Sequence, residues 1–240
     1  MAAMHKTAPE APAPTGDGVP QLQQGDRLTR AEFERRYEAM PDLKKAELIE
    51  GTVFMPSPVT IEKHSSPHAI LVGWLVQYWV ATPGVQVGDN GSVRLDPENM
   101  PQPDAFLMIL PEHGGQARID PDDYLEGAPE LAVEVSASSI SYDLNEKRTV
   151  YCRCGVREYL VWRVPDGELD WFVLREGRFE RLEPDAVGIY RSELFPGLWL
   201  DSGALLRGDL RAVFQALQAG LAHSEHAEFV IRLQQATGQQ

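Results

Sequence analysis

The sequence predicts an α/β fold built around a mixed β-sheet. Apolar residues at helical spacing predict a long core helix over residues 62–82. Two short apolar segments, 104–110 and 131–136, are typical of neighbouring buried strands. Three further strand segments within 157–182 are separated by the turn sequences PDG and EG, which predict antiparallel hairpins. The order resembles a βαβ unit followed by hairpins, so both parallel and antiparallel pairs are expected.

The remaining elements follow from local signals along the chain. Thr29 with Glu32 three residues on forms a capping-box pattern, which predicts a helix over 30–38. Gly51 separates two short strands, and residues 85–88 and 92–95 are expected to pair as strands. The polar segment 111–129 predicts a surface excursion and residues 141–154 a helix, while the apolar stripe Leu206, Leu210, Val213, Phe214, Leu217 and Leu221 predicts helices that pack on the parent domain or on a second copy.

Composition bounds the class of protein. The chain has 240 residues, of which 43% are hydrophobic, as expected for one globular domain with tails. Residues 1–27 are rich in Pro, Ala and Gly and lack the apolar core of a signal peptide, so we expect a disordered segment. The longest apolar stretch, 69–81, is shorter than the roughly 20 residues of a membrane span. These features predict a soluble cytoplasmic protein without a membrane partner.

Charge and cysteine usage narrow the possible functions further. A net charge of -14 counts against an ordinary DNA-binding module, because the chain repels phosphate. Cys152 and Cys154 are the two cysteines of the chain, so no disulfide framework is expected, and core packing is favoured over a zinc site.

A carboxylate within a buried strand is the first sign of chemistry. Glu134 lies between Val133 and Val135, where an unpaired charge is costly. Asp104 follows Pro103 at the start of the other apolar strand. If the two strands pair, both carboxylates can bind one hard cation such as Mg²⁺.

A lysine on the following helix is positioned to join this pair. Asp143 and Lys147 are four residues apart and share a helix face, so Lys147 can reach back over the carboxylates, orient an attacking water and offset charge on a phosphoryl group.

Each of these residues also has a simpler interpretation. Strand alternation could aim Ala132, Glu134 and Ser136 at water. Asp104 could cap a turn, and Lys147 could form an exposed ion pair with Asp143 worth about 0.3–0.5 kcal/mol. His64 and His68 lie one turn apart and are expected to face a groove or solvent, with His64 a possible substrate contact.

The ordered motifs resemble the Uma-type restriction endonuclease family of the PD-(D/E)XK nuclease superfamily. The matching motifs are ELIEG at 47–51, SP at 57–58, Pro103-Asp104, EVSASS at 134–139, the series Asp143, Lys147 and Tyr151, and GVREYLVW at 155–162. The resemblance implies a restriction-endonuclease-like domain over 28–201, with a central mixed sheet flanked by helices, and leaves 202–240 as a C-terminal helical extension.

The resemblance also implies roles for individual residues. Asp104 and Glu134 would be the metal ligands, and Lys147 would replace the lysine that a standard E-x-K motif places at Ser136. Glu47 would be an additional acidic residue, and Asp143 a further candidate.

The sequence therefore predicts a nuclease that uses Mg²⁺ or Mn²⁺ to hydrolyse phosphodiester bonds, with DNA as the expected substrate. A homodimer is plausible because cutting both strands requires two sites. The alternative is a non-catalytic binding or assembly module that retains the nuclease fold, which the net charge of -14 favours.

Overall fold

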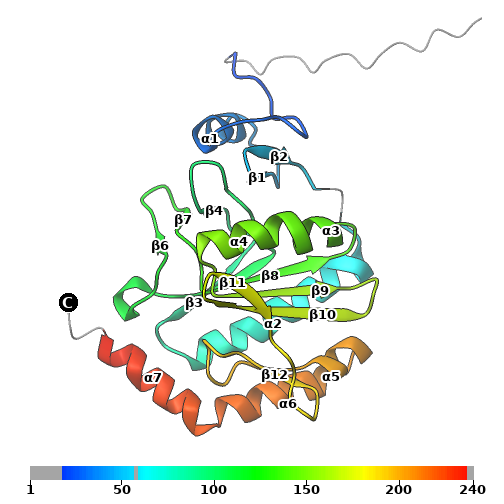
Figure 1. Ribbon diagram of the computed structural model, residues 1–240, viewed down its shortest axis with the longest axis vertical. Helices are drawn as coiled ribbons and strands as arrows, with labels where there is room; N and C mark the ends of the chain where they lie inside the picture. The colour runs from blue at the N-terminus through cyan, green and yellow to red at the C-terminus, as the bar shows by residue number, and fades with distance from the viewer. Residues whose placement is uncertain (1–17, 57–58, 237–240) are drawn as a thin grey trace, which may run out of the picture.

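A six-stranded mixed sheet forms the centre of the computed structural model, which describes residues 18–56 and 59–236 (Figure 1). The strand order is β11-β10-β9-β8-β5-β3. The strands are β3 (Val85–Asp89), β5 (Ala105–Ile109), β8 (Leu131–Ser136), β9 (Glu158–Arg163), β10 (Glu168–Arg175) and β11 (Arg178–Arg181). β8 and β9 pair in parallel and the other pairs are antiparallel, so the predicted mixed α/β sheet is confirmed.

A helical segment connects the parallel strands β8 and β9, as a parallel connection requires. It consists of α3 (Ile140–Tyr142), the π-helical turn η3 (Asp143–Lys147) and α4 (Arg148–Cys154). Gly155 ends it with a φ of +88°, a left-handed conformation that costs glycine little. The predicted helix over 141–154 is therefore present, with a π-helical turn at the position of Asp143 and Lys147.

Helices cover both faces of the central sheet (Figure 1). On one face, α2 (Ser66–Ala81), which continues the π-helical turn η1 (Ile61–Ser65), packs through Leu71, Trp74 and Tyr78. On the other face, Tyr151 of α4 packs against Ala132 and Tyr159. Because helices lie on both faces, every residue of β8 is buried, and the interpretation that alternate residues of this strand point to water is wrong.

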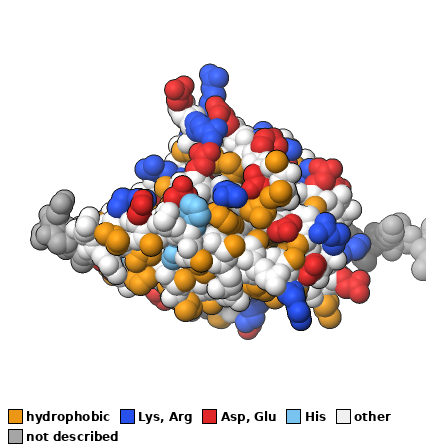
Figure 2. Space-filling model, turned by 90° about the horizontal axis from the view of Figure 1, so that it is seen from below, with side chains coloured by type: hydrophobic (Ala, Val, Ile, Leu, Met, Phe, Trp, Pro, Cys, Tyr) orange, Lys and Arg blue, Asp and Glu red, His pale blue; other side chains and the backbone are white. Residues whose placement is uncertain are grey.

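The C-terminal helices pack on the parent domain, which was one of the two predicted outcomes. They are α5 (Ser202–Arg207), α6 (Leu210–Leu221) and α7 (Ser224–Ala236). Val213 and Leu217 of α6 belong to the same core cluster as the buried residues of α2. In the sequence, the C-terminal helices follow an antiparallel hairpin formed by β12 (Ile189–Arg191) and β13 (Trp199–Asp201). Figure 2, seen from below, shows apolar side chains on this side between charged side chains of both signs. No helix within residues 18–56 and 59–236 is both long and apolar enough to cross a membrane.

The N-terminal part of the domain forms a smaller layer next to the sheet. Thr29 caps α1 (Arg30–Glu38) by accepting a hydrogen bond from the Glu32 backbone N–H, as its sequence predicts. The hairpin β1 (Glu47–Ile49) and β2 (Thr52–Phe54) turns at Gly51, also as predicted. Of the predicted disordered segment 1–27, residues 1–17 lie outside the described residues, as does the SP motif at 57–58. Within residues 18–27, Leu22 is buried in the apolar cluster of this layer with Phe33 and Leu48, so this part of the segment is not disordered throughout. The domain boundaries themselves stay a prediction.

Two local predictions are wrong. Residues 85–88 and 92–95 do not pair with each other: β3 pairs with β5 over five residue pairs, whereas the two-residue β4 (Val93–Arg94) joins β7 (Leu125–Glu126) and β6 (Arg118–Ile119) in a separate sheet. The longer, fully buried β5 offers β3 more ladder bonds and more apolar area than β4 can. Cys152 and Cys154 are half-buried rather than core residues, and their thiols donate to Gly177 O and Asp96 Oδ2.

Candidate active site

The register of the sheet places Asp104 beside Glu134. Ala105 pairs with Val133 in the antiparallel ladder of β5 and β8, so the next position along puts Asp104 opposite Glu134. The Val135 backbone N–H donates to Asp104 Oδ2 at 2.8 Å. Glu134 shares a sheet face with Ala132, two residues before it, and this is the face that α4 covers. Both carboxylates are therefore buried at one place between the sheet and the helical segment.

Lys147 is the cation at the centre of this place. Its Nζ lies 2.6 Å from Glu134 Oε1, 2.8 Å from Glu47 Oε1 and 3.9 Å from Asp143 Oδ1. The Lys147 side chain is 2% exposed, which excludes the solvent-exposed ion pair considered from the sequence. Tyr151, one turn further along the helical segment, donates its hydroxyl to Glu134 Oε1 at 3.0 Å. We call this buried group, which consists of Glu47, Glu134, Asp143, Lys147 and Tyr151, the inner cluster.

Asp143 fixes the start of the helical segment to β8. Its Oδ2 accepts hydrogen bonds from the Ser136 and Ser139 hydroxyls, both at 2.6 Å. Ser136 is the position at which a standard E-x-K motif carries lysine, and here its hydroxyl orients a carboxylate instead. The serine thus helps to hold the helical turn that delivers Lys147.

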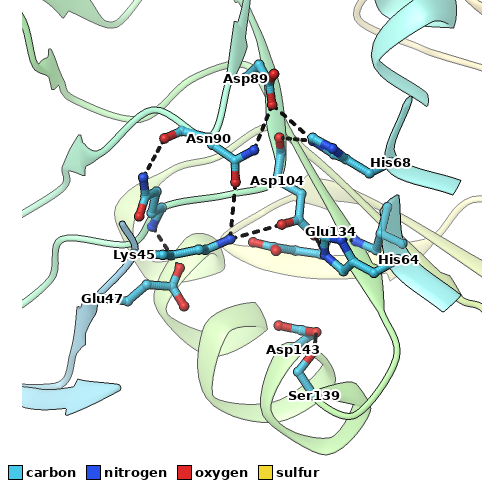
Figure 3. A network of polar contacts seen from close by, with 12 residues as sticks. Lys45, Glu47, His64, His68, Asp89, Asn90, Asp104, Glu134, Ser139 and Asp143 are labelled. Atoms are coloured by element: carbon cyan, nitrogen blue, oxygen red, sulfur yellow. Dashed lines mark hydrogen bonds and ion pairs between the residues drawn. The ribbon is translucent and has the colours of Figure 1, made fainter. Parts of the chain in front are cut away.

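A second, more exposed layer surrounds Asp104 (Figure 3). Lys45 Nζ lies 2.9 Å from Asp104 Oδ1, and His64 Nε2 lies 3.2 Å from Asp104 Oδ2. His68 Nε2 lies 2.8 Å from the Asp104 backbone oxygen and 3.0 Å from Asp89 Oδ1. We call this group, together with Asn90, which contacts Lys45 at 3.4 Å, the outer layer.

The electrostatics of the two carboxylates differ. Burial opposes ionisation of Asp104, but the hydrogen bond with His64 and the charge of Lys45 outweigh it and hold the pKa of Asp104 below its usual value. Burial raises the pKa of Glu134, and the nearby Asp104 and Asp143 add to this, while the Lys147 charge opposes it. Burial also disfavours the Lys147 charge, but Glu134 and Glu47 outweigh it and raise the Lys147 pKa. An added cation would relieve the cost of ionising Glu134.

Several features fit a hard divalent cation held by Asp104 and Glu134. Glu134 Oε2 has no hydrogen-bond partner within the described residues, so one of its oxygens remains available. The buried Gln102, whose backbone N–H donates to Glu47, also has an unpartnered side-chain Oε1. The site holds four carboxyl groups and two lysines, so ionisation of all four would leave an excess of negative charge that a cation could offset.

The site offers few protein ligands for a metal ion. Within the described chain, no group of three or more His, Cys, Asp or Glu side chains is arranged to hold a metal ion. Mg²⁺ commonly uses one or two carboxylates, several waters and substrate phosphate oxygens, so two carboxylates match this ion better than a closed zinc site.

All six candidate residues of the sequence prediction lie in this one region: Glu47, His64, Asp104, Glu134, Asp143 and Lys147. Gln102 joins the inner cluster and the outer layer, because its backbone N–H donates to the Glu47 carboxylate and its side-chain amide donates to the backbone oxygen of Asn90. The catalytic and metal-binding roles of the six residues stay predictions.

Sequence reasoning did not identify Lys45, Asn90 or Gln102. For Lys45 a signal existed, because it lies two residues before Glu47, and alternate residues of an extended segment share a face. For Asn90 and Gln102 the sequence contained no such signal. Asn90 follows β3 and Gln102 precedes β5, and the sequence pattern does not specify the partners of these strands.

A family model described as "Uma2: Putative restriction endonuclease" matches residues 30–203. A crystal structure described as a putative nuclease belonging to DUF820, from Anabaena variabilis, is similar with a TM-score of 0.54 and 14% sequence identity, and the similarity covers 72% of this chain and 96% of that chain. At this identity the likeness shows the fold. No curated protein matches the chain. Because the family model covers well over half of the sequence and includes every candidate residue, the chain belongs to the Uma2 family of restriction endonuclease-like proteins.

Proposed function

We propose that this protein is an endonuclease that uses Mg²⁺ or Mn²⁺ to hydrolyse phosphodiester bonds in DNA. The observation that carries the proposal is the position of Asp104 opposite Glu134, one residue beyond the paired part of β5 and β8, beside a buried lysine and with one Glu134 oxygen left available. Family membership supports nuclease activity in general, and the substrate and the metal are our inference.

The roles follow from the contacts of each residue. Asp104 and Glu134 would hold the ion, which, when bound, lowers the pKa of a water ligand and stabilises negative charge on the phosphate. The Lys147 charge favours ionisation of Glu134 against the effect of burial, and Lys147 would help to orient the attacking water. Glu47 positions Lys147, and Asp143 anchors the helical turn that carries it. His64, half-buried next to Asp104, is the proposed substrate contact among the histidines.

Incubation with DNA tests the proposal directly. Plasmid, linear duplex and single-stranded DNA are each incubated at low salt with Mn²⁺, with Mg²⁺ and with EDTA, because salt weakens phosphate binding. We expect cleavage that requires the metal and is absent in Asp104→Asn. The substitution keeps the shape of the side chain and removes one charge, so a near-wild-type circular dichroism spectrum should accompany the loss.

Calorimetry with Mn²⁺ separates this proposal from its alternative. A nuclease should bind Mn²⁺ through Asp104 and Glu134, and both Asp104→Asn and Glu134→Gln should weaken binding. If the wild type binds no Mn²⁺ and cleaves no nucleic acid, the chain is a non-catalytic module that keeps the nuclease fold, as its net charge of -14 would favour.

A homodimer with two such sites is part of the same proposal, because duplex cleavage needs one site per strand. Sedimentation at micromolar concentration would detect it. A monomer that nicks a single strand would remove this part of the proposal and leave the chemistry in place.

A further inference from the structure

The two lysines of the site have different surroundings. Lys147 has three carboxylates within 3.9 Å, and its side chain is 2% exposed. Lys45 contacts one carboxylate, Asp104, and the Asn90 side-chain oxygen, and its side chain is 22% exposed. The charge of Lys147 is therefore compensated by several carboxylates within the protein, whereas Lys45 has one carboxylate partner and a side chain that is partly exposed to solvent.

We propose that Lys45 is a substrate-binding residue whose ammonium group contacts a phosphate of the nucleic acid, whereas the ammonium group of Lys147 contacts carboxylates of the protein. This inference rests on the proposed nuclease function. It assigns a contact with the substrate to a residue other than Asp104, Glu134 and Lys147, the three residues that the sequence identified as catalytic.

The backbone holds Lys45 firmly at this position. The next residue, Ala46, is 1% exposed, and Glu47 begins β1 with its carboxylate on Lys147. The Asn90 side-chain oxygen lies 3.4 Å from Lys45 Nζ, and the Asn90 backbone N–H donates to the backbone oxygen of Asp104 at 3.2 Å. The lysine is thus oriented before any ligand binds, which lowers the entropy cost of binding.

The charge balance also favours a phosphate contact at Lys45. The chain carries a net charge of -14, so a nucleic acid can approach the carboxylates only where a cation offsets them. Lysine is a common phosphate ligand that acts as a point charge. The Asp104 carboxylate now neutralises the charge of Lys45. A divalent ion bound to Asp104 would compete for this carboxylate, so that the Lys45 ammonium group could contact a phosphate of the substrate instead.

A purely structural ion pair between Lys45 and Asp104 is the competing explanation. In that case, removing Lys45 should alter the folding stability or the Mn²⁺ affinity and leave nucleic-acid affinity unchanged. The two explanations therefore differ in a measurement that does not depend on turnover.

The test compares Lys45→Met with Lys44→Met in the full chain. Lys44 is the adjacent residue, is exposed and has the same charge, so it controls for the loss of one positive charge. Binding of a fluorescent duplex oligonucleotide is followed by anisotropy in Ca²⁺, and KM and kcat are measured in Mn²⁺. We expect Lys45→Met to weaken oligonucleotide binding and to raise KM, each about tenfold, and Lys44→Met to match the wild type within about twofold. Lys45→Arg, which keeps the charge, should recover most of the affinity.

Equal oligonucleotide affinities for Lys45→Met and Lys44→Met, in a wild type that does cleave, would overturn the role of Lys45 and leave the nuclease proposal standing. A wild type that neither binds nor cleaves any nucleic acid would overturn both. Circular dichroism of each variant, together with Lys45→Arg as a second variant, separates a binding defect from misfolding.

Discussion

Glu134 and Glu158 are both buried glutamates, on the adjacent parallel strands β8 and β9, yet their environments differ. Glu158 is completely buried and its two oxygens accept four hydrogen bonds, from the backbone N–H groups of Glu193 and Leu194, the Ser192 hydroxyl and the Trp171 indole. Among the described residues it has no ion pair. Glu134 instead binds Lys147 and Tyr151 through one oxygen, and its second oxygen has no partner there.

The difference distinguishes a structural carboxylate, Glu158, from Glu134, for which we propose a functional role. Glu158 binds the segment around residue 193 to the sheet, and each of its two carboxylate oxygens accepts two hydrogen bonds. Glu134 keeps binding capacity beside Asp104 at a cost in stability, which is the expected condition of an active-site group.

Removal of the buried cation should give the largest effect. Lys147→Met leaves Glu134 and Glu47 buried without their compensating charge, so we expect the free energy of unfolding to fall by about 3–5 kcal/mol. Urea denaturation measures it. Adding Glu134→Gln to this variant should restore part of the loss, and a loss below about 1 kcal/mol would show that Lys147 contributes no more than a surface ion pair.

Substitutions of Glu134 and Glu158 should differ in their effect on activity. In Glu134→Gln we expect metal-dependent cleavage to fall at least about a hundredfold, or roughly 2.7 kcal/mol, because a charged ligand is lost. Glu158→Gln should retain activity per folded molecule. Both variants are assayed with the same DNA and Mn²⁺, and similar activity losses in the two would contradict the division into functional and structural carboxylates.

The pH dependence of stability should identify Glu158. Burial raises the pKa of Glu158 to about 7, although its four donors oppose this, so the folded state binds a proton that the unfolded chain releases above its ordinary pKa of 4.5. Stability from this group is therefore present below pH 4.5 and is lost as pH rises to about 7. Between pH 5 and 7 the wild type should lose about 2 kcal/mol more than Glu158→Gln, as measured by denaturant unfolding. Parallel pH profiles for the two proteins would be inconsistent with this assignment.

The smallest effect concerns a tyrosine beside the inner cluster. The Tyr142 hydroxyl is buried without a hydrogen-bond partner among the described residues, while its ring packs 4.3 Å from that of Phe54 and 5.8 Å from Lys147 Nζ. Tyr142→Phe keeps the ring packing and removes the unpaired group, so we expect stability to rise by about 1 kcal/mol. Thermal unfolding measures the change, and a decrease in stability would indicate that the hydroxyl is hydrogen-bonded in solution.

Local sequence patterns determined most of the elements of this protein. Thr29 with Glu32, Gly51, and the helical spacing of Leu71, Trp74 and Tyr78 each act over a few residues, and these elements form where predicted. The candidate residues Asp104, Glu134 and Lys147 could also be proposed from sequence, because a charge in an apolar strand requires a partner.

Tertiary structure decided which segments meet and how much solvent each side chain contacts. The sequence placed both Glu134 and Glu158 in strands and gave no sign that one would meet a lysine and the other four hydrogen-bond donors from 171–194. It also mispaired 85–88 with 92–95, and it did not place Lys45 beside Asp104, 59 residues away. Such contacts depend on strand pairing and on packing between distant segments, whose energies no local pattern contains.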